Sequence, residues 1–191
     1  MLVSGSGSNL QALLDGEGEY RVVSVLSDRT GVRALERAAV AGVAAEVVAW
    51  KGDRAEFTAR VCDVVGKAGA EAVVLAGFMR ILGSEAMERF PHRILNIHPS
   101  LLPAFPGAHA VRQALDHGVA VTGVTVHFVD EQVDHGPIIA QVPVAVRADD
   151  TEETLHARIQ EAEHLLYPRV VTALASGAIS VRGRGVEWAP S

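Results

Sequence analysis

The sequence predicts an α/β protein with a doubly wound, mainly parallel sheet and antiparallel strands toward the C-terminus. Three observations support this class. Short apolar, β-branched runs alternate with amphipathic segments of helical length, which is the pattern of parallel strands joined by helices. Polar or glycine-rich stretches follow several of these runs, as expected where strand ends form a binding edge. Two longer runs, 120–130 and 138–146, are joined by a short loop, which favours an antiparallel pair.

Length and composition indicate one domain over 1–191, large enough to bury about 70% of its unfolded surface. The composition is 49% hydrophobic and 21% charged, and no apolar run reaches membrane-helix length. No basic segment precedes an apolar core at the N-terminus, so we predict no secretory signal. The single cysteine, Cys62, permits no internal disulfide, and this favours a cytoplasmic location. The net charge of −6 argues against nucleic acid as the main partner.

The N-terminal segment combines a strand stub with a glycine- and serine-rich loop. The stub, Leu2-Val3, is so short that we expect it to be poorly anchored. The loop over 4–10 follows, and a helix is predicted to start near Asn9. Small residues and a helix N-terminus suit an anion, and the missing third glycine of the dinucleotide fingerprint favours a monophosphate. A plain strand-to-helix turn capped by Ser8 or Asn9 explains the same residues equally well.

The next elements follow from β-branched runs and helical spacing. We predict strands over 20–27, 44–50 and 71–76, a helix over 32–41 ended by Gly42, and a helix over 53–66 capped by its Asp. Cys62 lies in the second helix without an acid–base neighbour, so we assign it a structural role. The segment 77–83 leaves a strand at its C-terminal end and is too apolar for an exposed turn. It therefore forms core or one wall of a pocket for a flat ring.

A polar pair lies at the end of the strand predicted over 93–98. Because side chains alternate along a strand, Asn96 and His98 share one face, and Leu95 and Ile97 the other. Pro99 biases the chain toward ending the strand there. The amide can donate a fixed hydrogen bond, and the imidazole can carry or release a proton near neutral pH. The alternative is a buried polar pair that only satisfies loop backbone.

The C-terminal elements complete the prediction. We expect a helix over 109–117, strands over 120–130 and 138–146 joined by the loop 131–137, a helix over 152–176, and a closing hairpin over 178–181 and 186–188. Asp149 or Asp150 is the predicted cap of the long helix, and Pro168 is expected to kink it. Its buried stripe is predicted to contain Leu155, Ile159, Ala162 and Leu166.

One carboxylate, Asp134, is predicted to lie beside His98. A carboxylate favours the protonated imidazole, and His98 and Asn96 could then both donate to an oxygen that becomes negative in a tetrahedral intermediate. Asp134 could also relay the proton. No nucleophile is expected nearby, so direct transfer between two bound substrates is favoured over a covalent intermediate.

A metal centre is the competing interpretation of the histidine and acid residues. Its candidate ligands are His98, His127, Asp134 and His135. None of these pairs has the spacing of a known zinc motif, so we predict no metal. Surface positions are predicted for His92, His117 and His156.

Four motifs carry a resemblance to a known family. They are Ser-Gly-Ser-Gly-Ser-Asn-Leu-Gln at 4–11, Leu-Ala-Gly-Phe-Met-Arg-Ile-Leu at 75–82, Leu-Asn-Ile-His-Pro-Ser-Leu-Leu-Pro at 95–103 and Val-Asp-His-Gly-Pro-Ile-Ile at 133–139. Over nearly the whole chain the sequence resembles the phosphoribosylglycinamide formyltransferases, folate-dependent enzymes of purine synthesis. The third motif is specific to formyltransferases as a group, and the second narrows the resemblance to this family.

The resemblance implies a Rossmann-like formyltransferase fold and a direct reaction. The amine of glycinamide ribonucleotide would attack the formyl carbon of 10-formyltetrahydrofolate as cosubstrate, without a metal. His98 would be the general acid, Asn96 the oxyanion donor, and Asp134 the group that keeps His98 protonated and relays the proton. The N-terminal half would bind the ribonucleotide phosphate, and the C-terminal half would bind folate and carry out catalysis.

The resemblance also implies two sets of binding residues. Those matching the ribonucleotide contacts are Gly7, Ser8, Asn9, Gln160 and Glu163. Those matching the folate pocket are Arg54, Met79, Arg80, Ile81, Leu82, Asp130, Glu131, Gln132 and Val133. The implied partners are these two small molecules, with no nucleic acid or membrane, and a homodimer is permitted.

Three departures and three rivals qualify the resemblance, and the first departure is the short first strand. His135 stands where glycine is common and adds a titratable group beside Asp134, and Val111 stands where a histidine is expected. Methionyl-tRNA formyltransferases share the third motif but carry a tRNA-contacting domain, and formyltetrahydrofolate hydrolases share the trio but carry a regulatory domain. We expect neither extra domain in this chain. A non-catalytic nucleotide-binding module would leave the trio unexplained.

Overall fold

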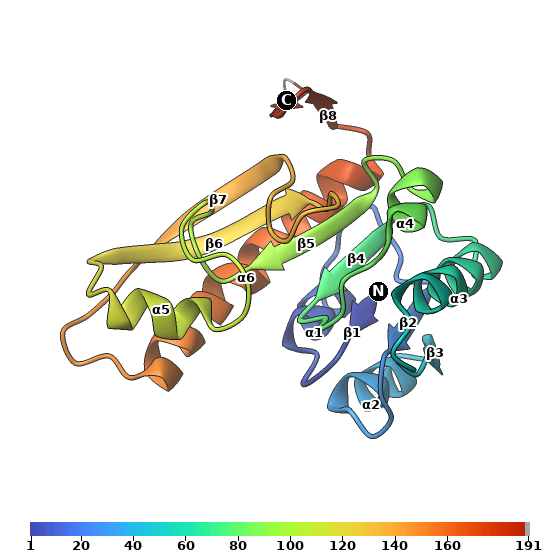
Figure 1. Ribbon diagram of the computed structural model, residues 1–191, viewed down its shortest axis with the longest axis horizontal. Coiled ribbons are helices and arrows are strands. Elements are labelled where there is room, and N and C mark those ends of the chain that lie inside the picture. Colours follow the sequence, from blue (N-terminus) through green and yellow to red (C-terminus); the bar gives the residue numbers. More distant parts are fainter. Residues whose placement is uncertain (190–191) are drawn as a thin grey trace.

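The computed structural model describes residues 1–189 and is built around one large sheet (Figure 1). Its strands are β1 (Leu2–Val3), β2 (Ser24–Ser27), β3 (Ala44–Val47), β4 (Val73–Ala76), β5 (Ile94–His98), β6 (Val121–Phe128), β7 (Ile138–Ala145), β8 (Ile179–Arg182) and β9 (Gly185–Trp188). Its helices are α1 (Ser8–Leu14), α2 (Arg33–Val40), α3 (Arg54–Lys67), α4 (Ser84–Arg89), α5 (Ala110–Asp116) and α6 (Glu152–Ala175).

The sheet has the order β3-β2-β1-β4-β5-β6-β7. The strands from β3 to β5 are parallel, whereas β6 runs antiparallel to both β5 and β7. The predicted fold class is therefore confirmed. The strand order reverses between β1 and β4, which opens a crevice at the C-terminal ends of these strands, where ligands bind in this class of fold.

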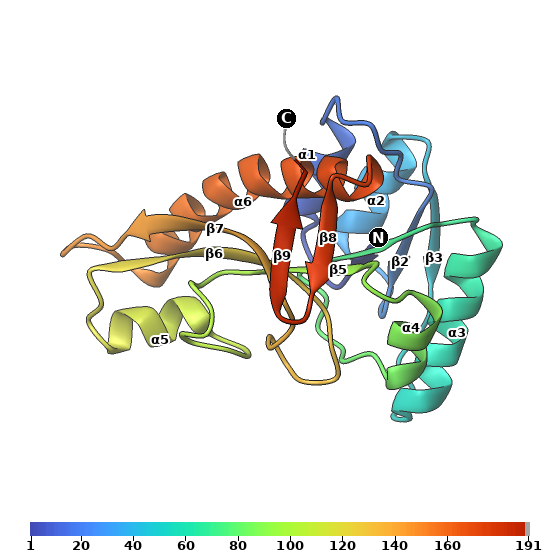
Figure 2. The same ribbon diagram turned by 90° about the horizontal axis from the view of Figure 1, so that it is seen from above.

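Helices cover both faces of the sheet. Figure 2 shows α1, α2 and α6 on one side and α3 and α4 on the other, whereas α5 packs against α6. The strand sequences explain this arrangement, because adjacent residues belong to opposite cores. Leu2 packs in the cluster beneath α3 and α4, whereas Val3 packs in the cluster beneath α1 and α6. The central strands β1 and β4 are buried on both faces and consist entirely of apolar residues.

The first strand is better anchored than its length suggests. We expected Leu2-Val3 to be poorly held, and this is wrong. β1 lies in the centre of the sheet, where it pairs with β2 on one side and β4 on the other, and both side chains are fully buried. Two-sided pairing and burial compensate for the short strand.

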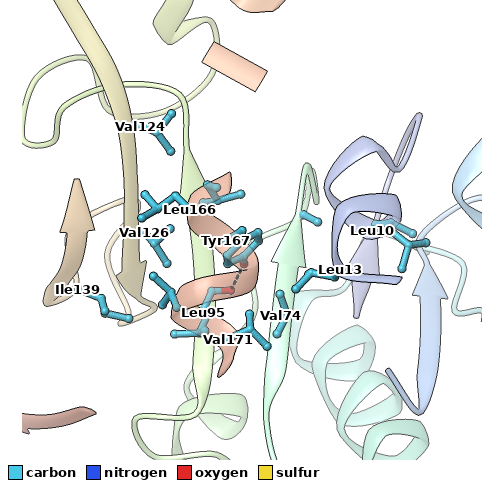
Figure 3. Close-up of a cluster of buried hydrophobic side chains, with 14 of the residues drawn as sticks. Leu10, Leu13, Val74, Leu95, Val124, Val126, Ile139, Leu166, Tyr167 and Val171 are labelled. Carbon is cyan, nitrogen blue, oxygen red and sulfur yellow. Dashed lines mark hydrogen bonds between the residues drawn. The ribbon is translucent and has the colours of Figure 1, made fainter. Parts of the chain in front are cut away.

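The long helix α6 is fastened to the sheet through Tyr167. Its ring is fully buried in the larger apolar cluster. Its hydroxyl donates to the carbonyl oxygen of Leu75 at 2.6 Å and to that of Leu95 at 3.3 Å, and Figure 3 shows the second of these bonds. This contact joins α6 to β4 and β5 near the strand ends that carry the polar pair. Burial raises the pKa of Tyr167 well above its usual value, so the phenol remains a donor.

Several predicted elements differ in their ends. The strands predicted over 20–27, 44–50 and 71–76 are shorter, because their neighbours provide pairing only over Ser24–Ser27, Ala44–Val47 and Val73–Ala76. The six-residue helix α4 was not predicted. The N-cap of α6 is Thr151, in a reciprocal capping box with Thr154, rather than Asp149 or Asp150. Asp150 instead accepts hydrogen bonds from Arg158.

The remaining expectations about elements are confirmed within a few residues. Asp53 caps α3, Gly42 and Gly118 follow their helices with positive φ, and the closing hairpin is formed by β8 and β9. α6 continues through Pro168 as one helix, and the kink expected at this residue stays a prediction. Cys62 is buried, and burial raises the pKa of its thiol. His92, His117 and His156 are exposed. Within residues 1–189, no helix has the length and apolar character to cross a membrane.

Candidate active site

A cavity of about 640 Å³ lies at the C-terminal ends of β1, β4 and β5. This volume is within the usual range for small-molecule sites. Three segments predicted to gather at this edge line it, namely the loop before α1, the segment 77–82 and the end of β5. The loop after β6 and the inner face of α6 complete the lining. The sequence-predicted residues in the lining are Gly7, Ser8, Asn9, Met79, Arg80, Ile81, Leu82, Asn96, His98, Asp130, Gln132, Val133, Asp134, Gln160 and Glu163.

His98 and Asp134 meet inside this cavity. His98 Nδ1 lies 3.3 Å from Asp134 Oδ2, and its Nε2 lies 2.8 Å from the carbonyl oxygen of Phe105. Because a carbonyl oxygen only accepts hydrogen bonds, Nε2 carries a proton and donates a hydrogen bond to the carbonyl oxygen of Phe105. Asp134 Oδ2 also accepts from the backbone N–H of Gly107 at 2.7 Å. The loop after β5 therefore orients both the imidazole and the carboxylate.

Asn96 is the third member of this group. Its Nδ2 donates to Asp134 Oδ1 at 3.3 Å and lies 3.1 Å from His127 Nε2. His127 Nδ1 lies 2.8 Å from the carbonyl oxygen of Phe128 and donates to it, which leaves Nε2 as the acceptor for Asn96. Both amide hydrogens are thus directed at protein groups. The contact to Asp134 is the longer, so it is the one that a substrate oxygen could replace most easily.

The electrostatics of His98 differ from the sequence-based expectation. Burial is the largest effect and lowers the pKa of His98, while Asp134 and the Phe105 carbonyl oppose it only in part. Asp134 by itself favours the protonated ring, as expected, but burial of the ring, which is invisible in the sequence, outweighs it in the net pKa shift. Although burial opposes its ionisation, the neighbouring His127 ring, the backbone N–H of Gly107 and His98 hold the pKa of Asp134 below its usual value.

The apolar wall over 77–83 is held by polar contacts from neighbouring elements. The backbone N–H of Met79 donates to Ser4 Oγ at 2.9 Å, and that of Gly83 donates to Thr58 Oγ1 at 2.8 Å. Arg54 donates to the carbonyl oxygen of Leu82. Met79 and Ile81 remain exposed and face the cavity as an apolar surface.

Arg80 is positioned by a buried acid and an aromatic ring. Its Nε donates to Asp28 Oδ2 at 2.8 Å, and its guanidinium carbon lies 5.1 Å from the centre of the Trp50 ring. The Asp28 side chain is fully buried. Burial opposes ionisation of Asp28, but the Ser4 hydroxyl, Arg80 and Arg29 hold its pKa below the usual value. Sequence reasoning did not identify Asp28 as part of this wall.

Glu163 and Asn9 meet on the opposite side of the cavity, although 154 residues separate them. Asn9 Nδ2 donates to Glu163 Oε2 at 2.7 Å. Glu163 is only 6% exposed, and burial raises its pKa to about 7 while Asn9 opposes the shift. Near neutral pH this carboxyl therefore exchanges a proton with solvent and can either accept or donate a hydrogen bond.

The raised pKa of Glu163 predicts a pH-dependent stability. Between pH 4.5 and about 7, the folded state keeps a proton that the unfolded state has lost. The free energy of unfolding should therefore fall by roughly 3 kcal/mol across this range relative to Glu163→Gln. Denaturant unfolding of both variants at pH 4.5 and 8 measures this difference. The control is Glu161→Gln, at an exposed position of the same helix, whose free energy of unfolding should change with pH as that of the wild type does. The prediction would be contradicted if the free energy of unfolding of Glu163→Gln changed with pH as much as that of the wild type.

Some residues differ from the predicted lining. Arg54 and Glu131 do not line the cavity, because Arg54 turns to Leu82 and Glu131 is exposed on its loop. Residues missed by sequence reasoning include Gly107, His109 and His156 in the lining. His127 was considered only as a metal ligand. Its pairing opposite Asn96 depends on the β5–β6 register, which sequence spacing alone does not provide.

Among residues 1–189, no group of three or more His, Cys, Asp or Glu side chains is arranged to hold a metal ion. The candidate set from the sequence divides into two parts. His98, His127 and Asp134 lie together, whereas His135 points to Asp130, with its Nδ1 2.8 Å from Asp130 Oδ2. His135 is thus next to Asp134 in the sequence, but its ring is hydrogen-bonded to Asp130.

The sheet order, and the amide, imidazole and carboxylate that meet beside the C-terminal end of β5, suit an enzyme that transfers a group between two bound substrates. A family model described as formyl transferase matches residues 1–171, and the chain belongs to this family. The crystal structure of glycinamide ribonucleotide transformylase 1 from Symbiobacterium toebii superimposes with a TM-score of 0.97 at 47% identity, covering 99% of this chain and 92% of that one.

Within the family, the chain belongs to the phosphoribosylglycinamide formyltransferases. The protein of that name from Mycobacterium tuberculosis is 48% identical over 189 residues, which cover 96% of this chain and 87% of that protein. The trifunctional purine biosynthetic protein adenosine-3 of Gallus gallus is 44% identical over 191 residues. The match covers 97% of this chain but only 19% of the length of that trifunctional protein.

Proposed function

We propose that this protein transfers the formyl group of 10-formyltetrahydrofolate to the amine of glycinamide ribonucleotide in purine biosynthesis. The observation that carries the proposal is the convergence of Asn96, His98 and Asp134 in one cavity. The loop over 5–9 lies at another side of the same cavity. The two parts of the cavity suit a reacting carbonyl and a phosphate. The names of the relatives indicate glycinamide ribonucleotide as the acceptor and a formyl group as the group transferred, and the family resemblance indicates the folate donor.

Each substrate has a matching part of the cavity. The ribonucleotide phosphate would bind the backbone of Gly7, Ser8 and Asn9, where α1 begins, and its sugar would face Gln160 and Glu163. The pterin of the folate would lie against the apolar wall over 78–82 and the loop over 130–134. The amine and the formyl group would then meet beside the catalytic trio.

The proposed reaction is a direct attack. The amine nitrogen bonds to the formyl carbon, the C=O electron pair moves to oxygen, and the bond from carbon to N10 of the folate then breaks. The amine loses a proton and N10 gains one. Asn96 donates to the forming oxyanion in place of its 3.3 Å contact with Asp134. The developing negative charge raises the pKa of His98, which, with Asp134, carries the proton.

A substrate-exchange assay tests this function. Purified protein with 10-formyltetrahydrofolate should formylate glycinamide ribonucleotide, and it should do so at the same rate after thorough chelation. Release of formate to water in place of transfer would favour a hydrolase, and formylation of charged methionyl-tRNA would favour the tRNA enzyme. Loss of activity after chelation with recovery on adding zinc would contradict the metal-free reaction.

A further inference from the structure

The C-terminal hairpin, β8–β9, lies beside the turn that joins β6 to β7 (Figure 2). Arg184, at the hairpin tip, donates from Nη2 to the backbone carbonyl oxygen of His135 at 2.7 Å. Trp188, on β9, donates from Nε1 to the carbonyl oxygen of Ile139 at 3.2 Å. The hairpin therefore holds two backbone positions of the segment that directly follows Asp134.

The side chain of His135 extends this contact into the loop. Its two ring nitrogens lie 3.3 and 3.4 Å from Arg184 Nη1, and its Nδ1 lies 2.8 Å from Asp130 Oδ2. The other carboxylate oxygen of Asp130 accepts from the backbone N–H of Gln132 at 2.9 Å. The imidazole is thus held between the guanidinium of Arg184 and the carboxylate of Asp130. Through His135, Arg184 is therefore linked to Asp130 at the start of the loop as well as to the backbone near its end.

This loop needs external support. Asp134 has a φ of 51°, a left-handed conformation that residues other than glycine, asparagine and aspartate rarely adopt. Residues 131–133 are exposed, so little burial holds this part of the loop. Gly136 fits directly against β6, where a Cβ would lie 1.8 Å from the carbonyl oxygen of Phe128. Contacts on either side of Asp134 therefore add to the hydrogen bonds from Gly107 and Asn96 that hold its carboxylate within reach of His98.

We propose that the hairpin clamps the loop over 129–137 and that Arg184 is a positioning residue for Asp134. Arg184 touches neither the trio nor the cavity lining, and it acts through the backbone and ring of His135. The claim that Arg184 affects turnover rests on the proposed formyl transfer. The claim that the hairpin restrains the loop does not depend on the reaction. Two measurements separate these claims.

The first measurement is amide hydrogen exchange of the loop in the full chain without ligands. Arg184→Ala removes one charge-assisted hydrogen bond and should speed exchange over 130–136 about tenfold. The matched control is Arg182→Ala on the same hairpin, where Arg182 is 77% exposed and pairs with Glu187 at 3.2 Å. Exchange in the control should equal that of the wild type. Equal exchange in Arg184→Ala and the wild type would overturn the clamp.

The second measurement is the steady-state kinetics of formyl transfer. Arg184→Ala should lower kcat/KM for 10-formyltetrahydrofolate about tenfold, with the KM for glycinamide ribonucleotide changed less than about twofold. Arg184→Lys, which keeps the charge and can still donate to the His135 carbonyl but lacks the planar guanidinium, should recover part of the loss. Faster exchange with unchanged kinetics would overturn the positioning role. A wild type without transfer activity would refute the proposed function, and the exchange result would still decide the clamp.

Discussion

Replacing His98 with alanine is expected to lower kcat about a thousandfold while both substrates still bind. His98 is the group in the trio whose ordinary pKa lies nearest neutrality, and it sits between Asp134 and the Phe105 carbonyl. Removing the ring therefore removes the proton carrier but leaves the phosphate loop and the apolar wall in place. Rapid-quench kinetics give the rate of the chemical step, and isothermal titration gives the dissociation constant of the ribonucleotide, which should change less than about threefold.

A conservative variant separates proton transfer from packing. His98→Gln keeps an amide donor for the Phe105 carbonyl but cannot carry a proton. It should lose as much turnover as the alanine variant while its thermal midpoint stays closer to that of the wild type. Near-normal turnover in His98→Gln would show that the imidazole only supports the loop.

Replacing Asp134 with asparagine is expected to lower kcat about a hundredfold or more. Asparagine has nearly the same shape and tolerates the left-handed backbone at this position, so the loop should keep its path. The amide removes the negative charge beside His98 Nδ1. It also cannot accept from both Gly107 and Asn96 through two oxygens, as the carboxylate does.

The pH profile identifies the reason for this loss. Asp134 raises the pKa of His98 against the effect of burial, so its removal lowers that pKa further. If turnover needs the protonated ring, the alkaline limb of the kcat profile should move to lower pH in Asp134→Asn. Asp63→Asn, which removes an exposed charge on α3, should leave the profile unchanged. An unshifted alkaline limb in Asp134→Asn would contradict the coupling between Asp134 and His98.

Much of the fold could be predicted because its signals are local. Alternation along 94–98 placed Asn96 and His98 together, and the short loop after β6 indicated the antiparallel strands. The helix α4 gave no comparable signal, since six residues show hardly two turns of periodicity. The anchoring of β1 was also missed, because it depends on two neighbours distant in the chain.

The site was less predictable where it depends on distance and burial. The contact of Glu163 with Asn9 spans 154 residues, and that of Arg184 with His135 spans 49. No spacing rule connects such pairs. The direction of the pKa shift of His98 was also missed, because the sequence shows the carboxylate but not the packing that removes water from the ring. The individual binding roles came from the resemblance and remain proposals.

The central claim is that one cavity brings a sugar-linked amine and a folate formyl group together beside Asn96, His98 and Asp134. A crystal structure with glycinamide ribonucleotide and an unreactive 10-formyl folate analogue tests it most directly. The amine nitrogen should lie roughly 3.5 Å from the formyl carbon, with the phosphate on the backbone of residues 7–9 and the formyl oxygen within hydrogen-bonding reach of Asn96. A structure with either ligand outside this cavity, or with the two reacting groups on opposite sides of the trio, would contradict the account.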